Sequence, residues 1–263
     1  MTDAVPASVP ALVTGASSGI GEEFARQLAA RGHDLVLVAR RKDRLEALAR
    51  ELRRDHRVAV DVLAADLETA AGRRRTRERL ASGGAWLLVN NAGFGSRGPF
   101  ARADASRERA EVMVNVVALH ELTAAVVPAN VAAGGGAVVN VASTAGYQPI
   151  PYMATYAATK AFVLHFTEAL AEELRGTGTR ALALCPGPTR TEFDTVAGVS
   201  ALFERSMPMS SAAVVRSALR ALDRGRVICV PGLHNLVLAQ GPRLVPRSAL
   251  RRLMAPVFGM GAG

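Results

Sequence analysis

An α/β fold, in which one parallel sheet carries helices on both faces, is predicted for this chain by three observations. Short apolar segments typical of strands alternate along the chain with segments of helical period. Some apolar segments are nearly continuous, as in Leu35-Val-Leu-Val-Ala39, and such runs are typical of parallel strands buried on both sides. A glycine-rich turn and a helical pattern follow the first strand-like segment, which is the order that a nucleotide-binding loop requires.

The predicted elements follow one another without a linker between domains. Strands are expected at residues 11–14, 34–39, 58–64, 86–90, 137–142, 180–185 and 227–230. Helices are expected at residues 22–30, 42–55, 68–81, 104–130, 154–176 and 211–225. No repeat, low-complexity block or proline-rich linker divides the 263 residues, and 49% hydrophobic residues are ample for a core. We therefore predict a single domain, 1–263.

The glycine-rich turn has the residues of a dinucleotide-binding loop. It reads Gly15-Ala-Ser-Ser-Gly19-Ile-Gly21. Glycines permit a tight turn and let the backbone approach a pyrophosphate, whose charge meets the amide groups at the helix start. In the order strand, turn, helix, it indicates a Rossmann-type doubly wound parallel sheet of about seven strands. Alone, such a turn could equally be structural.

A second motif has the residues of a proton-transfer site. Ser143 precedes the segment Tyr156-Ala-Ala-Thr-Lys160, and Tyr156 and Lys160 share one face of a helix because they lie four residues apart. An ammonium group beside a phenol favours the phenolate, so we expect Lys160 to lower the pKa of Tyr156 toward the working range. A serine hydroxyl opposite could hold a carbonyl or alcohol oxygen. Alone, the pair could be a coincidence on an exposed turn; together, the two motifs are strong evidence.

With these motifs the chain resembles the short-chain dehydrogenase/reductase family over about residues 10–195. The matching segments, in family order, are Thr14-Gly-Ala-Ser-Ser-Gly-Ile-Gly21, Asn90-Asn-Ala-Gly93, Asn115, Ser143, Tyr156-x3-Lys160 and Pro186-Gly187. The resemblance implies that Tyr156 is the general acid or base and that Ser143 orients the substrate carbonyl. It implies that Lys160 also contacts the nicotinamide ribose and that Asn115 holds a water that links Lys160 to solvent. Asn115 could instead be an amide that bridges backbone inside a helix.

The resemblance also implies a set of cofactor-binding residues. They are Gly15, Ser17, Ser18, Gly19, Ile20, Gly21, Arg40, Arg41, Asp66, Leu67, Asn91, Ala92, Gly93, Tyr156, Lys160, Pro186, Gly187, Thr189 and Thr191. Asp66 could also cap the following helix, and Asn90 could serve the sheet rather than a ligand. Where the family often has an aspartate before the fourth strand, this chain has Ala85-Trp86, which puts a local structural contact in doubt.

The second strand favours NADP(H) as the cofactor. It ends in Arg40-Arg-Lys42, with no acid before Asp43, whereas NAD-selective folds place a carboxylate there for the ribose 2′-hydroxyl. A guanidinium forms charge-assisted bonds to a 2′-phosphate. The alternative is that these cations are solvated, but three cations at a helix start oppose the helix dipole unless an anion is bound. We predict that Arg40 is the chief contact and Arg41 its support.

The predicted reaction is hydride transfer between NADP(H) and a carbonyl or secondary alcohol. Candidate substrate-pocket residues are mostly apolar, which favours a hydrophobic ketone or acyl chain; they are Phe94, Tyr147, Gln148, Tyr152, Met153 and Phe193. Two alternatives stay open: a dehydratase or epimerase on the same fold, and a non-catalytic dinucleotide sensor. Residues 188–209, rich in proline and glycine, are expected to form a substrate loop. Residues 231–263 are a C-terminal extension expected to cap the substrate cleft or dock on a neighbour.

Composition limits the remaining partners. The net charge is +9, and most of it lies after residue 216 as arginines, but no nucleic-acid motif accompanies it. The N-terminus lacks the pattern of a signal peptide, and no apolar run approaches the ~20 residues needed to span a bilayer. We therefore expect a cytoplasmic protein with no transmembrane segment. Peripheral contact with anionic lipid is a lesser alternative. The two cysteines have neither metal-ligand nor disulfide spacing, so no metal is expected. The resemblance implies a homodimer or homotetramer, because members of that family commonly pair through long helices, and the predicted helices at 104–130 and 154–176 are long with small or apolar outer residues.

Overall fold

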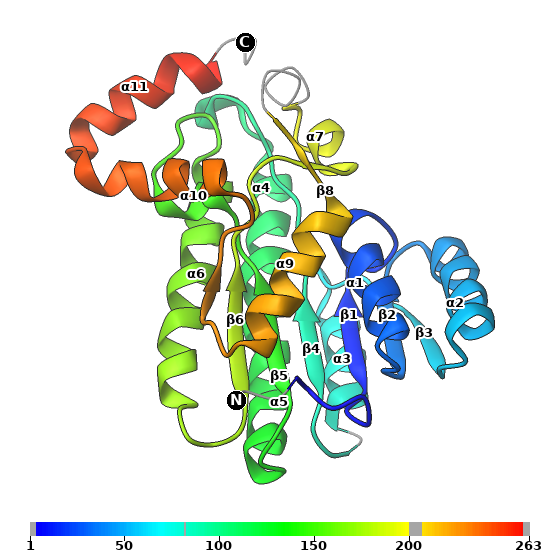
Figure 1. Ribbon diagram of the computed structural model, residues 1–263. Coiled ribbons are helices and arrows are strands. Elements are labelled where there is room, and N and C mark those ends of the chain that lie inside the picture. Colours follow the sequence, from blue (N-terminus) through cyan, green and yellow to red (C-terminus); the bar gives the residue numbers. More distant parts are fainter. Residues whose placement is uncertain (1–3, 82, 200–206, 260–263) are drawn as a thin grey trace.

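A parallel seven-stranded sheet forms the centre of the computed structural model, which describes residues 4–81, 83–199 and 207–259 (Figure 1). The strand order is β3-β2-β1-β4-β5-β6-β9. The strands are β1 (Ala11–Thr14), β2 (Leu35–Ala39), β3 (Val60–Ala64), β4 (Leu87–Asn90), β5 (Ala137–Val141), β6 (Arg180–Leu184) and β9 (Ile228–Cys229). The chain returns from the β3 edge to pair β4 with β1, so the sheet is doubly wound, as predicted.

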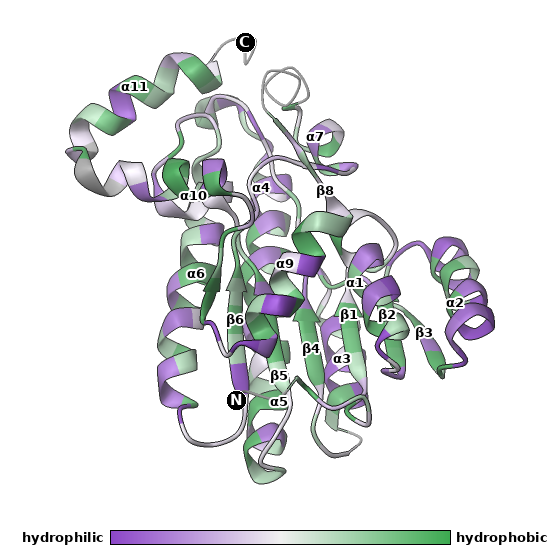
Figure 2. Ribbon diagram, viewed as in Figure 1, coloured by the Kyte–Doolittle hydropathy of each residue, from purple (hydrophilic) through white to green (hydrophobic). Residues whose placement is uncertain are grey.

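Helices cover both faces of this sheet, as Figure 1 shows. One face carries α1 (Gly19–Ala30), α2 (Lys42–His56) and α9 (Ser211–Asp223), which bury Phe24, Leu45 and Leu219 against the strands. The other face carries α3 (Ala70–Ala81), α5 (Leu119–Ala132) and α6 (Ala154–Glu173). The central strands are hydrophobic along most of their length (Figure 2), as expected for strands buried on both sides.

The predicted helix at residues 104–130 is one continuous helix with a change of winding at its centre. It comprises α4 (Ala105–Val112), a π-helical stretch (Met113–Ala118) and α5. Among the described helices, this 28-residue helix is the one whose length and apolar composition alone would let it cross a membrane. Buried Leu122 and Val126 pack it against the sheet, which is the arrangement of a core helix.

Ala85-Trp86 stands where the family often has an aspartate, which put a local structural contact before β4 in doubt. Asn130 of α5 makes contacts at this place. Asn130 is completely buried; its side-chain oxygen accepts a hydrogen bond from the Trp86 N–H at 2.8 Å, and its amide donates to the Trp86 carbonyl at 3.0 Å. These two bonds satisfy backbone groups that would otherwise be buried without partners at the start of β4. Gly136 passes so close that a Cβ there would lie 2.6 Å from the Asn130 amide.

Short elements lie beyond the carboxyl ends of the strands, at the top of Figure 1. They include the 3-10 turns Phe100–Arg102 and Thr144–Tyr147, strands β7 (Thr189–Arg190) and β8 (Met209–Ser210), and helix α7 (Phe193–Val196). Strands β7 and β8 pair in parallel at the two ends of the predicted substrate loop, of which residues 200–206 lie outside the described part. The extension forms α10 (Leu233–Gln240), the 3-10 turn Gly241–Leu244 and α11 (Arg247–Gly259). Its residues 260–263 are also outside the described part.

Candidate active site

A cavity of about 1060 Å³ lies at the carboxyl ends of the strands and joins the two motifs recognised in the sequence. Every predicted cofactor-binding residue lines it except Gly21, and of the predicted catalytic residues Ser143, Tyr156 and Lys160 line it while Asn115 does not. Its size is that of a large ligand site, and it runs from the turn after β1 to the turn after β6. The structure therefore brings together residues from positions 15 to 191 in one site.

The glycines of the turn are required by its geometry. Gly15 and Gly19 have positive φ angles of 66° and 60°, which residues with a Cβ rarely adopt. A Cβ on Gly21 would lie 2.3 Å from the Gly15 carbonyl oxygen, so the helix could not start so close to the turn. Ser18, at the N-cap of α1, makes no side-chain capping bond, which leaves the first amide groups of the helix available to an anion. A dinucleotide phosphate fits this cradle.

Two polar side chains fasten this turn to the end of β4. The Thr14 hydroxyl accepts the backbone N–H groups of Asn91 and Ala92, at 2.9 and 3.0 Å, and donates to the Val89 carbonyl. The Asn91 amide donates in return to the carbonyl of Thr14 at 2.9 Å. Asn91 is therefore a support of the cradle as well as part of its lining. Asn90 is structural, because its amide donates to Asn140 and Thr123 inside the core.

Tyr156 and Lys160 lie on the first turns of α6 and are both buried, with 8% and 5% of their surfaces exposed. The Lys160 ammonium donates to the carbonyl of Val141, at the end of β5, at 2.8 Å and lies 5.8 Å from the centre of the Tyr156 ring. Ser143 follows β5, caps the next 3-10 turn and lies within hydrogen-bonding reach of Tyr156. The predicted Ser-Tyr-Lys cluster is thus assembled at the floor of the cavity.

The expectation that Lys160 lowers the pKa of Tyr156 was wrong. Burial raises the pKa of Tyr156 to about 12, and the hydrogen bond with Ser143 only partly opposes this effect. Burial likewise lowers the pKa of Lys160 to about 8, against the attraction of a nearby carboxylate, Glu111. Desolvation disfavours the charged form of each group and is the largest effect on both pKa values. Tyr156 is therefore a neutral phenol at pH 7.

Asn115 lies in the π-helical stretch, where its side chain bridges backbone from another segment. Its oxygen accepts the Phe94 N–H at 3.1 Å, and its amide donates to the Phe94 carbonyl at 2.9 Å and to the Thr159 hydroxyl at 3.1 Å. A Cβ on Gly93 would lie 2.8 Å from the Asn115 oxygen and 3.5 Å from the Lys160 nitrogen. Asn115 thus holds the segment 93–94 beside Lys160, and its role in a proton relay stays a prediction.

The adenosine end of the cavity carries the predicted cations. Arg40 lines the cavity, and Arg41 is tied to the turn by bonds to the hydroxyls of Ser17 and Ser18 at 3.0 and 2.8 Å. Asp66 also lines it, half-buried, and accepts a hydrogen bond from the Glu68 N–H at 3.0 Å. Asp66 does not cap α3, which begins later than predicted, at Ala70.

The turn after β6 and the substrate loop close the nicotinamide end. The Pro186 carbonyl accepts the Thr144 N–H at 3.0 Å, which joins this turn to the segment after β5. Thr191 packs against Gly19, and the ring of Phe193 lies 5.3 Å from that of Tyr156. Of the predicted substrate-pocket residues, Phe94, Gln148, Met153 and Phe193 line the cavity, whereas Tyr147 and Tyr152 do not.

The C-terminal extension contributes a wall that the motifs did not reveal. Its cavity-lining residues are mostly apolar; they are Val237, Leu238, Gly241, Pro242, Val245, Leu250, Met254, Val257 and Phe258. Asn235 of α10 lies so close to the turn after β6 that a Cβ on Gly187 would be 2.2 Å from its side-chain oxygen. This position is consistent with the first of the two expectations for the extension, that it caps the cleft, which stays a prediction. In the sequence, the only indication of this wall was a mixed apolar and basic pattern after the last strand.

Glu111 is a second feature that sequence reasoning missed. Its side chain is completely buried in α4, and neither carboxylate oxygen has a hydrogen-bond partner within the described structure. Burial raises its pKa to about 7, an effect that nearby Glu108 adds to and that Ser96, Lys160 and Arg107 oppose. One acid within an amphipathic helix gives no signal of this kind, because its burial depends on which face packs inward.

The pH dependence of stability tests this assignment. The pKa of Glu111 is higher in the folded protein, so raising the pH from about 4.5 to 7 ionises the unfolded chain first and destabilises the fold. Glu111→Gln mimics the protonated acid. We expect its melting temperature to equal that of the wild type near pH 4.5 and to exceed it increasingly up to pH 7, with a constant difference above. Exposed Glu173→Gln is the control; a pH-independent difference for Glu111→Gln would contradict the assignment.

Comparison with known proteins supplies the context for this site. The family described as "short chain dehydrogenase" matches residues 10–198. A sulfoacetaldehyde reductase of Chromohalobacter salexigens is 39% identical over 207 residues, which are 74% of this chain and 76% of that protein. A very-long-chain 3-oxoacyl-CoA reductase of Podospora anserina is 38% identical over 169 residues, which are 62% of this chain but only 50% of that protein.

Two solved structures resemble nearly the whole chain. A short-chain dehydrogenase from Sphingobium yanoikuyae in complex with NADPH is 40% identical, with a TM-score of 0.83 over 94% of this chain and 95% of that one. The bulky-bulky ketone specific alcohol dehydrogenase from Comamonas testosteroni is 36% identical, with a TM-score of 0.79 over 94% of each chain. With the glycine cradle, Ser143 and the buried Tyr156 and Lys160 at one cavity, these matches lead to one conclusion. The chain belongs to the short-chain dehydrogenase family of oxidoreductases.

Proposed function

We propose that the protein is an NADP(H)-dependent oxidoreductase that transfers a hydride between the cofactor and a bulky apolar ketone or the corresponding secondary alcohol. The observation that carries the proposal is the single cavity that joins the glycine cradle, with its arginines, to the Ser143, Tyr156 and Lys160 cluster. The NADPH complex of a 40% identical relative supports the choice of cofactor. When bound, the nicotinamide supplies the hydride. This chain's own residues orient the substrate and hold the transferred proton.

Tyr156 holds the proton that the reaction moves. Because its pKa is raised to about 12, the phenol is protonated at pH 7 and is ready to donate to a carbonyl oxygen during ketone reduction. Ser143, within reach of the same phenol, orients that oxygen. Lys160 is held against the Val141 carbonyl at 2.8 Å, so its ammonium has a fixed position on the cofactor side of Tyr156. The burial of Tyr156 and Lys160 limits the access of water to the transferred proton.

The shape and lining of the cavity support a bulky substrate. Phe193 and Met153 pack in one apolar cluster with Tyr156, and apolar residues of α10 and α11, including Val237 and Leu250, line the same cavity. A related structure is specific for bulky-bulky ketones, whereas another relative is a reductase of the small, charged sulfoacetaldehyde. A wall of aliphatic side chains solvates an apolar group better than a sulfonate. Oxidation of NADPH with a panel of ketones, including sulfoacetaldehyde, tests the proposal.

Replacement of the catalytic phenol tests the mechanism. Tyr156→Phe deletes only the oxygen that carries the proton, and general acid catalysis contributes ~10²–10⁴-fold. We expect turnover of the best ketone to fall by at least about 100-fold while NADPH affinity, followed by its fluorescence, changes little. Lys160→Ala is the comparison, because it should reduce both turnover and cofactor affinity. Retention of more than about a tenth of wild-type turnover in Tyr156→Phe would show that the acid role is wrong.

Cofactor choice is tested at the second strand. Arg40 lines the cavity and has no hydrogen bond or ion pair to another part of the described structure, so it is available to a 2′-phosphate. We expect Arg40→Asp to weaken NADPH binding by at least ~10-fold, given ~1.5–3 kcal/mol for a hydrogen bond to a charged group. NADH binding should change less. Wild-type protein that binds NADH as tightly as NADPH would refute the assignment and leave the reductase proposal standing.

We further propose a cytoplasmic homodimer or homotetramer. The outer faces of α5 and α6 carry exposed apolar side chains, among them Val131 and Phe162, and Phe162 stacks on Phe166 with ring centres 5.6 Å apart. Burial of these residues by a second copy would remove apolar surface from water. Sedimentation equilibrium at micromolar concentration should therefore report a dimer or tetramer, and Phe162→Arg should shift it toward the monomer. A wild-type monomer under the same conditions would rule the assembly out.

A further inference from the structure

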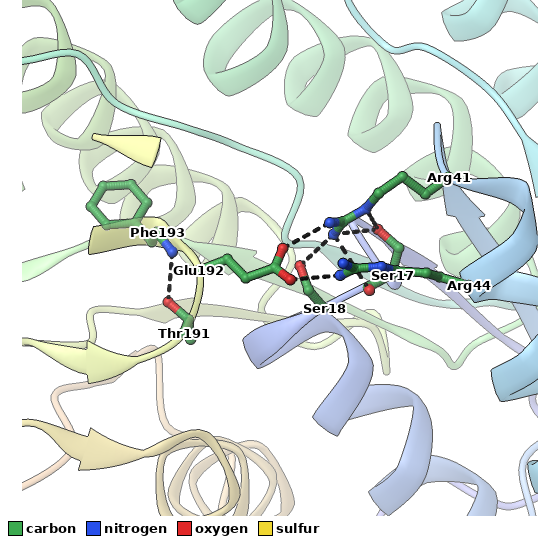
Figure 3. Close-up of polar contacts among 7 residues, drawn as sticks. All are labelled: Ser17, Ser18, Arg41, Arg44, Thr191, Glu192 and Phe193. Carbon is green, nitrogen blue, oxygen red and sulfur yellow. Dashed lines mark hydrogen bonds and ion pairs between the residues drawn. The ribbon is translucent and has the colours of Figure 1, made fainter. Parts of the chain in front are cut away.

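A carboxylate of the substrate loop lies among the cations at the adenosine end of the cavity. One Glu192 oxygen accepts from Arg41 Nη1 at 2.8 Å and the other accepts from Arg44 Nη1 at 2.5 Å (Figure 3). The hydrogen bonds from Arg44 and Arg41 lower the pKa of Glu192 to about 2, so it is an anion throughout the physiological range. Both arginines are far from Glu192 in sequence, so the contact joins the loop to the nucleotide-binding half.

Arg41 is a fixed part of the cofactor site. Its Nε and Nη2 atoms both donate to the Ser17 hydroxyl, at 3.1 and 3.0 Å, and Nη2 also donates to the Ser18 hydroxyl at 2.8 Å. These serines belong to the glycine-rich turn and line the same cavity. The turn therefore sets the orientation of the guanidinium, and Nη1 is the nitrogen that is directed to Glu192 (Figure 3).

The same short segment reaches the catalytic tyrosine. Thr191 packs against Gly19, Glu192 binds the arginines, and the ring of Phe193 lies 5.3 Å from that of Tyr156. The Phe193 N–H donates to the Thr191 hydroxyl at 3.2 Å, which keeps the backbone of the segment tightly turned. The residue that binds the arginines is therefore the direct neighbour of the residue that packs beside the reacting groups.

A 2′-phosphate bound by Arg40 would compete with Glu192 for the additional donors of Arg41 and Arg44. A phosphate monoester carries close to two negative charges near neutral pH and three acceptor oxygens, and guanidinium groups are its preferred partners. A carboxylate next to that phosphate would repel it and would share a limited number of N–H groups. NADH has only a hydroxyl at this position, so it does not compete with Glu192 for the arginines.

We propose that Glu192 is a specificity-determining residue: an internal anion that occupies Arg41 and Arg44 and is displaced by the 2′-phosphate of NADPH but not by NADH. Its carboxylate therefore reduces the preference for NADPH that the arginines alone would give. Displacement breaks the two ion pairs of Glu192 and leaves the contact of Thr191 with Gly19 in place. This inference depends on NADPH as a ligand but not on the identity of the substrate.

Binding measurements without turnover test the inference. Dissociation constants for NADPH, NADH, adenosine 2′,5′-bisphosphate and adenosine 5′-monophosphate are measured at one low ionic strength, because salt screens exposed charges. Glu192→Gln keeps the size of the side chain and removes its charge. For this variant we expect NADPH and the bisphosphate to bind roughly 3- to 10-fold more tightly, as two exposed ion pairs permit, and NADH and the monophosphate to change less than about twofold.

Two controls separate competition from other effects. Glu172→Gln removes an exposed carboxylate that forms an ion pair with Arg175 at 2.5 Å and does not line the cavity. This variant should leave all four dissociation constants unchanged. When Arg41 and Arg44 are both replaced by glutamine, the gain from Glu192→Gln should fall below about twofold, because the shared partners are gone. Weaker binding of both NADPH and NADH by Glu192→Gln would show that Glu192 fastens the loop over the cofactor. That result, or unchanged binding of all four ligands, overturns the proposal.

Discussion

Parallel pairing of β1, β4, β5 and β6 is the constraint on which the rest of the structure depends. The register places Val13 beside Val89, Asn90 beside Asn140 and Val141 beside Leu184, so the four strands end at one edge of the sheet. The segments that follow them supply the cradle, the turn at residues 91–93, Ser143 and the turn at 186–187. Hydrogen bonds then join neighbouring segments; for example, the Thr14 hydroxyl accepts the N–H groups of Asn91 and Ala92. Function is therefore built on a rigid edge and not on independent loops.

Burial controls the chemistry at this edge. Tyr156, Lys160 and Glu111 are all removed from water within one region, and each pKa moves in the direction that disfavours charge. The outcome is a neutral phenol that can donate a proton, beside a lysine whose ammonium is held by a backbone carbonyl. The unpaired carboxyl of Glu111 is a cost of this arrangement, and it makes stability depend on pH.

Charge placement joins the predicted substrate loop to the arginines after β2. The arginines after β2 are positioned by serines of the glycine-rich turn, and the loop brings its own carboxylate to them. Phe193 then connects the loop to Tyr156, and α10 and α11 complete an apolar wall beyond it. The adenosine end and the reacting end of the cavity are thus connected through three consecutive residues, Thr191 to Phe193.

The sequence by itself determined the sheet, the cradle and the chemical groups. Strand positions were predicted to within two residues, because buried parallel strands have a local apolar signature, and the glycines are dictated by a local turn. Only the tertiary structure decided that Tyr156 is neutral, that Asn115 bridges Phe94, that Thr69 and not Asp66 caps α3, and that the C-terminal helices line the cleft. These features arise from burial and from contacts between distant segments, as with Glu192 and Arg41. Periodicity and spacing describe neighbours along the chain, whereas desolvation and ion pairing depend on neighbours in space.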